Sequence, residues 1–196
     1  MTKHKTSPLY FTRRDRRRAS FGEEVNTFAE WLGWVPMEWQ QAFWDAALEY
    51  RKTPGVGRGW AYARRTATCT LPRQNGKSVA LLALAGWAAL KWDKMRIAWI
   101  AQERRVATEN LRSLFTLLAE KGKECTFINS MGHERIKFPN GSSIEVQSAT
   151  RRAGHGASWD LAVCDETWSL SYDVLQSVAP ALTARPSALL CMISTQ

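Results

Sequence analysis

Residues 71–78 read LPRQNGKS, and this stretch decides the fold prediction. It lies between a short apolar run over 67–71 and a helical pattern over 77–90. At such a junction, backbone N–H groups, here those around Gln74 and Asn75, face an anion at the N-terminus of a helix. The sequence therefore predicts a phosphate-binding loop of the Walker A type.

Three residues of the loop have side-chain or backbone roles in this interpretation. Gly76 lets the backbone approach the phosphates, Lys77 supplies a positive charge to the outer phosphates, and the Ser78 hydroxyl contacts magnesium. The alternative is a Gly-Lys-Ser triplet that merely begins a helix, and the general pattern has glycine where this chain has Leu71. The surrounding sequence has to decide between the two.

A second motif supports the first. Residues 161–166 read LAVCDE, an apolar run that ends in two carboxylates. This pattern predicts a buried strand with acids at its C-terminal tip, which is where open α/β sheets bind ligands. Asp165 would hold Mg²⁺, as in a Walker B motif, and Glu166 would orient and deprotonate the water that attacks the γ-phosphate of ATP. Exposed acids that cap the next element are the alternative.

The remaining pattern predicts an α/β fold of the P-loop NTPase (RecA/ASCE-like) class, with a mostly parallel sheet and helices on both faces. A hairpin is expected over 134–148 because apolar and polar residues alternate on either side of Asn140-Gly141. Residues 53–60 are expected to form a loop. The other expected elements are helices over 22–34, 37–50, 103–121 and 172–184, and strands over 96–101, 161–164 and 188–193.

Composition limits the class of protein. The chain has 196 residues, 45% hydrophobic and 23% charged, which is typical of one globular domain. The longest apolar stretch, 79–90, is too short to span a membrane, and the N-terminus does not resemble a signal peptide. The four cysteines lack disulfide or metal-binding spacing, so reduced thiols are expected.

Positive charge is concentrated at the N-terminus. The net charge is +9, and most of the excess lies within residues 1–20, in Lys3, Lys5, Arg13, Arg14, Arg16, Arg17 and Arg18. We expect a basic, flexible arm over 1–20 followed by an ATPase domain over 21–196. Such an arm indicates a polyanionic partner, although a solvated tail without a role has the same composition.

Four motifs, in this order, resemble the ATPase domain of the terminase large subunit, the DNA-packaging motor of tailed bacteriophages. They are RQNGKS, RIKFPNGSSIEV, LAVCDE and the terminal ISTQ. The resemblance covers roughly residues 35–196. It implies a motor that hydrolyses ATP with Mg²⁺ to move double-stranded DNA into a procapsid.

The resemblance implies further nucleotide contacts. Arg73 resembles a phosphate-binding basic residue of the family's variant loop. Gln40, or Gln41 if the alignment shifts by one, resembles the glutamine that recognises adenine. Ser194 and Thr195 resemble the coupling motif, whose hydroxyls sense the γ-phosphate or the attacking water.

The resemblance also implies an arginine that acts on a neighbouring subunit. Arg152, or alternatively Arg151, would reach into that subunit's site and neutralise charge in the transition state. Arginines that face DNA or solvent beside a glycine-rich loop are the competing interpretation.

Partners follow from the same resemblance. They are double-stranded DNA, the portal protein, the small terminase subunit and other copies of the chain in a five-membered ring. The expected location is the host cytoplasm and, transiently, the portal vertex of the procapsid, without membrane association. Large subunits continue into a nuclease domain that this chain lacks, so no DNA cleavage is expected of it.

Two other functions fit the same motifs. One is the first motor domain of a superfamily 2-type helicase or translocase, which would separate strands. The other is a DNA-binding module with a vestigial nucleotide site, which would bind DNA without hydrolysing ATP.

Overall fold

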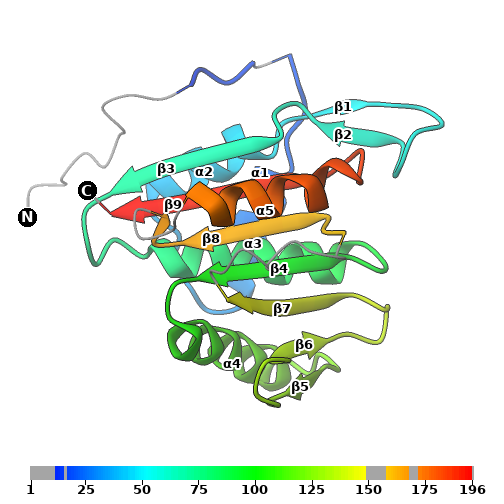
Figure 1. Cartoon of the computed structure of the whole chain (residues 1–196). Coiled ribbons are helices and arrows are strands. Elements are labelled where there is room, and N and C mark those ends of the chain that lie inside the picture. The colour runs from blue at the N-terminus through cyan, green and yellow to red at the C-terminus, as the bar shows by residue number, and fades with distance from the viewer. Residues whose placement is uncertain (1–11, 16, 149–157, 168–171, 196) are drawn as a thin grey trace, which may run out of the picture.

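A seven-stranded sheet forms the centre of the computed structural model, which describes residues 12–15, 17–148, 158–167 and 172–195 (Figure 1). In spatial order its strands are β3 (Thr66–Leu71), β9 (Leu189–Thr195), β8 (Leu161–Asp165), β4 (Arg96–Ala101), β7 (Ser143–Ser148), β6 (Arg135–Lys137) and β5 (Thr126–Ile128). Neighbouring strands from β3 to β7 pair in parallel. The last two pairings, of β7 with β6 and of β6 with β5, are antiparallel.

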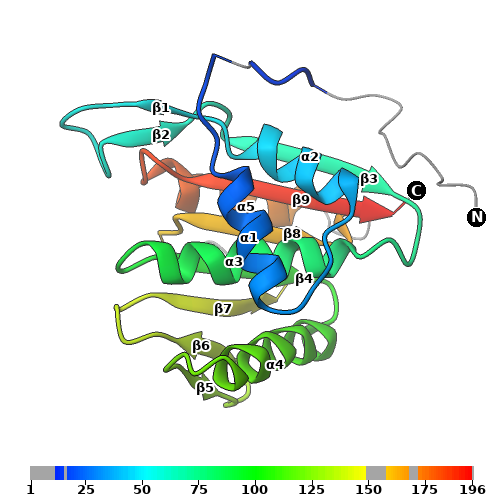
Figure 2. The same cartoon turned by 180° about the vertical axis from the view of Figure 1, so that it is seen from behind.

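Helices cover both faces of this sheet (Figures 1 and 2). Side chains alternate along β4, so that Ile97 and Trp99 join one apolar core while Ala98 and Ile100 join the other. The first core is shared with α1 (Gly22–Trp31), α2 (Glu38–Ala47), α3 (Lys77–Lys91) and α4 (Arg104–Glu120), and the second with α5 (Tyr172–Thr183). The predicted architecture is therefore confirmed.

The predicted hairpin over 134–148 is also confirmed. Strands β6 and β7 pair antiparallel with Ile136 opposite Ile144, and Gly141 in the turn has a φ of 81°. On its other side β7 pairs parallel with β4. The hairpin thus joins the parallel part of the sheet to its antiparallel edge.

Three short regions differ from the sequence prediction. The helix expected over 22–34 ends at Trp31, and a turn follows it. The helix expected over 37–50 ends at Ala47, and Tyr50 instead begins β1 (Tyr50–Lys52), which pairs with β2 (Trp60–Tyr62). The reason is aromatic packing, because the Tyr50 ring stacks on Phe21 with centroids 4.2 Å apart. The expected loop over 53–60 forms the tip of this hairpin except at Trp60, which begins β2. The short strand β5 was not expected.

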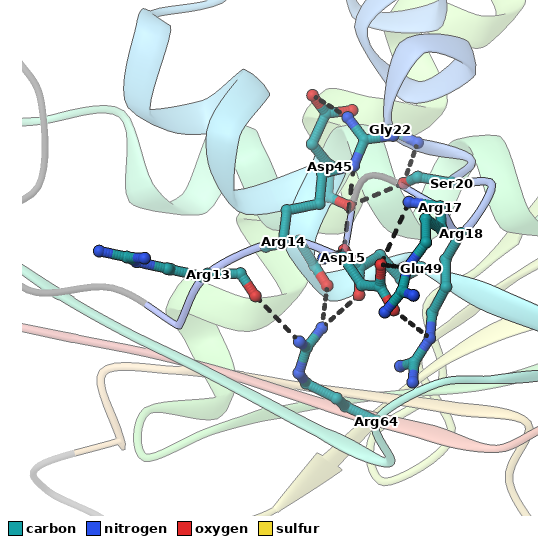
Figure 3. Close-up of polar contacts among 11 residues, drawn as sticks. Arg13, Arg14, Asp15, Arg17, Arg18, Ser20, Gly22, Asp45, Glu49 and Arg64 are labelled. Atoms are coloured by element: carbon teal, nitrogen blue, oxygen red, sulfur yellow. Dashed lines mark hydrogen bonds and ion pairs between the residues drawn. The ribbon is translucent and has the colours of Figure 1, made fainter.

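The N-terminal basic segment contacts the body of the protein in its described part, residues 12–15 and 17–20, which we call the strap (Figure 3). Glu49, whose side chain is 0% exposed, accepts hydrogen bonds from Arg64 Nη1 at 2.6 Å and from the backbone N–H of Asp15 at 2.7 Å. Arg14 forms an ion pair with Asp45 at 3.1 Å. A buried carboxylate therefore anchors the strap.

Glutamine in place of Glu49 is expected to destabilise the fold by about 2–3 kcal/mol, because hydrogen bonds to charged groups contribute roughly 1.5–3 kcal/mol each. The strap should then become easier to cleave with trypsin. Urea unfolding and limited proteolysis measure both effects. Asp45→Asn is the control, since its ion pair is partly exposed and such pairs contribute about 0–1 kcal/mol. Equal stability of the two variants would contradict the anchoring role.

In the described part of the chain, no helix combines the length and hydropathy that a bilayer-spanning segment requires.

Candidate functional site

Three parallel strands bring the predicted motifs to one edge of the sheet. Strand β9 lies between β3 and β8, and all three run in the same direction. Their carboxyl ends therefore share an edge, with the phosphate loop after β3, the acidic pair at the end of β8, and Ser194 and Thr195 at the end of β9. This is the edge at which α/β sheets bind ligands.

The loop and the acidic strand meet directly. The hydroxyl of Ser78 donates a hydrogen bond of 2.6 Å to Asp165 Oδ2, although 87 positions separate the two residues. The interpretation of both motifs required this convergence, and an isolated Gly-Lys-Ser at a helix start does not require it. The two residues proposed as magnesium contacts are therefore adjacent in space.

The donor set at this point fits a magnesium ion. The second carboxylate oxygen of Asp165, Oδ1, is buried and has no hydrogen-bond partner within the described residues. Burial raises the pKa of Asp165, while the bond from Ser78 lowers it. A cation beside Oδ1 would compensate the buried charge, and a carboxylate with a hydroxyl is a typical partial ligand set for Mg²⁺, completed by water and phosphate.

Asp165→Asn tests this fit through stability. The pKa of Asp165 is raised in the folded state, so its ionised form destabilises the fold above that pKa, and the cost is relieved as pH falls towards the unfolded value. Asparagine removes the charge and can still accept from Ser78. Without metal, the variant should unfold at a higher temperature than the wild type at neutral pH.

Addition of Mg²⁺ with ADP should stabilise the wild type and leave Asp165→Asn nearly unchanged. Differential scanning calorimetry at pH 7, with and without the metal, measures both differences. Asp93→Asn is the matched control, since Asp93 is exposed in the turn after α3. An equal response of wild type and Asp165→Asn to Mg²⁺ would remove Asp165 from the metal site.

The phosphate loop is closed by its own side chains. Asn75 Nδ2 donates to the carbonyls of Pro72 and Arg73 at 3.2 and 3.1 Å. The Lys77 side chain is buried and its Nζ donates to Pro72 O at 2.9 Å. Gly76 has a φ of 69°, in the left-handed region that favours glycine, and immediately precedes α3. The Lys77 side chain therefore lies against the loop at which the phosphates would bind.

Gln40 lies beside this loop but has protein partners. Its Nε2 donates to Gly76 O at 2.9 Å, and its Oε1 accepts from the N–H of Met37 at 2.8 Å. The residue is 3% exposed. Gln40 thus links α2 to the glycine of the loop, a contact that the sequence did not indicate. Its predicted contact with adenine stays a prediction, as does that of Gln41.

Glu166 and the coupling segment are in direct contact. Thr195 Oγ1 donates to Glu166 Oε2 at 2.8 Å. Glu166 has a φ of 58°, which is uncommon for a residue with a side chain and is a form of strain that clusters at functional sites. The next residue, Thr167, donates to the carbonyls of Cys164 and Ile193 and so ties the end of β8 to β9. Sequence reasoning missed Thr167, whose only signal is its position after the acidic pair.

Arg73 takes part in the loop through its backbone carbonyl, which accepts from Asn75 Nδ2 at 3.1 Å. Arg73 and Gln74 are exposed on the loop. Arg151 and Arg152 lie outside the described residues, so their roles stay predictions. Ser194 adjoins Thr195 at the end of β9, and both are half-buried.

Comparison with known proteins places the chain beside phage terminases. No family model matches it. It is 28% identical to the large terminase subunit of Enterobacteria phage HK97 over 138 residues, which make up 66% of this chain and 27% of that protein. The chain therefore spans about a quarter of its curated relative.

Solved structures show the same fold. The crystal structure of the HK97 large terminase matches with a TM-score of 0.71 and 20% identity, covering 91% of this chain and 38% of that one. The large terminase ATPase domain of Thermus phage P74-26 matches with 0.64 and 22%, covering 86% of this chain and 68% of that one. The large terminase of a thermophilic bacteriophage in complex with ATP-γ-S matches with 0.54 and 13%, covering 65% and 32%. The resemblance to terminase large subunits and the P-loop fold are thus confirmed.

Proposed function

We propose that this chain is the ATPase motor domain of a terminase large subunit and hydrolyses ATP to drive double-stranded DNA into a procapsid. The observation that carries the proposal is the 2.6 Å contact between Ser78 and Asp165, which brings the two halves of a nucleotide site together. The likeness to phage terminases, including one solved with ATP-γ-S, supports it.

The loop and the first turn of α3 bind the nucleotide. The backbone N–H groups ahead of Lys77 and the positive end of the helix attract the phosphates. Lys77 exchanges its bond with the Pro72 carbonyl for one with the outer phosphates, and Arg73 adds a second cation. Ser78 and Asp165 would hold Mg²⁺, which would supply positive charge beside the phosphate oxygens.

Glu166 acts as the general base in hydrolysis. Its carboxylate lies at the strand edge beside the loop, orients a water molecule towards the γ-phosphate and accepts a proton from it. Thr195 donates to the same carboxylate, so any change at Glu166 during turnover reaches β9 through one hydrogen bond. We propose that this contact couples hydrolysis to movement of β9.

The assembled motor extends the proposal. Five copies form a ring on the portal protein at the procapsid vertex in the host cytoplasm, and the small terminase subunit selects the start site. Arg152, or Arg151, acts in the neighbouring copy's site.

The proposal is tested by two assays. Phosphate release from ATP with Mg²⁺ should be detectable, and DNA packaging into procapsids should stop when Glu166 is replaced. Separation of a duplex in a strand-displacement assay would instead indicate the helicase-type function. DNA binding without any ATP turnover would indicate a vestigial nucleotide site.

A further inference from the structure

Two basic segments, the strap and β1, meet at one bridge of the fold. The strap is bridged to the residue before β1 by an antiparallel pairing of Ser20 with Glu49. From this bridge the strap continues towards Arg18, and β1 continues towards Arg51. The pairing continues for one residue, since the N–H of Tyr50 donates to Ala19 O at 3.0 Å. The strap then turns, because the N–H of Arg18 donates to Asp15 O at 2.8 Å.

The basic side chains of these segments face outwards. Arg17 is 92% exposed and Arg18 is 43% exposed, and Arg51 and Lys52 on β1 are exposed as well. We call these four residues the basic face.

The acidic residues near the basic face already form ion pairs and hydrogen bonds with neighbouring residues. Glu49 is fully buried, and Asp15 is held by Arg17 and Arg18 at 3.2 and 3.4 Å (Figure 3). The hydrogen bonds from Arg17 keep the pKa of Asp15 below its usual range. The carboxylates therefore order the strap and leave the outer surface positive. A strap ordered in advance loses little entropy when a ligand binds.

The chemistry of the basic face fits a phosphate backbone. Arginine forks match phosphate oxygens, and exposed cations that lie in neighbouring segments attract the negative charge of a duplex. Peripheral membrane binding needs inserted apolar groups as well, and none of the described residues of the strap or of β1 is a large exposed apolar side chain. The observations thus favour nucleic acid over an anionic membrane.

We propose that the basic face, held by Glu49, is a binding surface for the sugar-phosphate backbone of duplex DNA. It lies near the amino end of β3, whereas the phosphate loop follows the carboxyl end of that strand (Figure 1). The surface is therefore separate from the nucleotide site. This inference rests on the proposed function and deepens it, since it names the face that meets the duplex.

The test uses a fluorescein-labelled duplex of about 30 base pairs and mixed sequence, without nucleotide. Arg51→Ala with Lys52→Ala should weaken binding at least about tenfold and lower the slope of log K against log salt by about 2, since each lost phosphate contact contributes about 0.9. The matched control is Lys121→Ala with Lys123→Ala, two exposed lysines after α4, which should bind as the wild type does. Arg17→Ala with Arg18→Ala should reproduce the loss from the strap side.

Separate readouts distinguish failure of this inference from failure of the proposed function. ATP hydrolysis without DNA should be equal in wild type and the β1 variant, because none of the four residues belongs to the nucleotide site. DNA affinity within twofold of wild type in both variants would overturn the inference, whatever the ATPase result. An equal loss in the Lys121 and Lys123 variant would also overturn it. The inference would also be overturned if the protein bound phosphatidylserine vesicles but not the duplex, and if the variants weakened the vesicle binding. That result would assign the face to a membrane.

Discussion

Glutamine in place of Glu166 is expected to lower ATP turnover by about a hundredfold to ten-thousandfold, the usual contribution of a general base. The amide keeps the size of the side chain and still accepts the hydrogen bond from Thr195 Oγ1. It cannot accept a proton from water. ATP affinity should stay within about twofold of wild type, because the loss falls on the transition state rather than on binding.

Two measurements separate these effects: phosphate release under saturating ATP, and equilibrium binding of a fluorescent ATP analogue. Thr195→Val serves as the comparison, since it keeps the base and removes only the hydroxyl that holds it. We expect a smaller loss, about tenfold, from that variant, in line with removal of one orienting hydrogen bond. Undiminished turnover in Glu166→Gln would exclude Glu166 as the base.

The positions of both motifs followed from the sequence for a topological reason. Parallel strands end at the same edge of a sheet, so a loop after one strand and acids at the end of another lie along that edge. The LPRQNGKS and LAVCDE patterns each marked a strand end. What the sequence left open was whether the strands are neighbours. Strand β9 lies between them, and the Ser78 contact spans it.

The contacts of Gln40 and Glu49 could not be predicted from the sequence in this way. Gln40 bonds a carbonyl 36 positions away, and Glu49 binds Arg64 from a segment whose β1–β2 hairpin has no strong strand signal. The contact of Gln40 depends on how α2 lies against the start of α3. The contacts of Glu49 depend on how the strap and Arg64 meet the end of α2. Buried glutamates are rare in general. The partners of Glu49 come from distant parts of the chain, so the sequence around Glu49 does not indicate them.

The same reasoning explains the misplaced end of the second helix. Residues 37–50 carry a continuous helical pattern, and nothing in their spacing ends it at Ala47. Phe21, from the other end of the N-terminal region, forms a cluster with Tyr50, Trp60 and Trp92, with ring centroids 4.2–5.3 Å apart. These long-range aromatic contacts hold Tyr50 in an extended strand and override its local preference.

Lys77→Ala is expected to have the second of the two largest effects, a loss of about a hundredfold to a thousandfold in turnover, comparable to removal of a preorganised charge donor. Lys77 is the first residue of α3 and its ammonium is within reach of the loop, where it donates to the Pro72 carbonyl at 2.9 Å. Alanine removes both this closing bond and the charge that we propose meets the outer phosphates. ATP affinity should therefore fall together with turnover, in contrast to Glu166→Gln.

Two companion variants sharpen the interpretation of Lys77→Ala. Lys77→Arg keeps the charge, but a guanidinium cannot occupy the buried position of the ammonium without displacing the loop, so it should recover ATP binding only in part and turnover hardly at all. Arg73→Ala removes an exposed cation from the same loop and should cost about tenfold if Arg73 contacts phosphate. Isothermal titration with ATP and phosphate release measure the three variants together. If Lys77→Ala binds and hydrolyses ATP as the wild type does, residues 71–78 are the start of a helix and not a phosphate site.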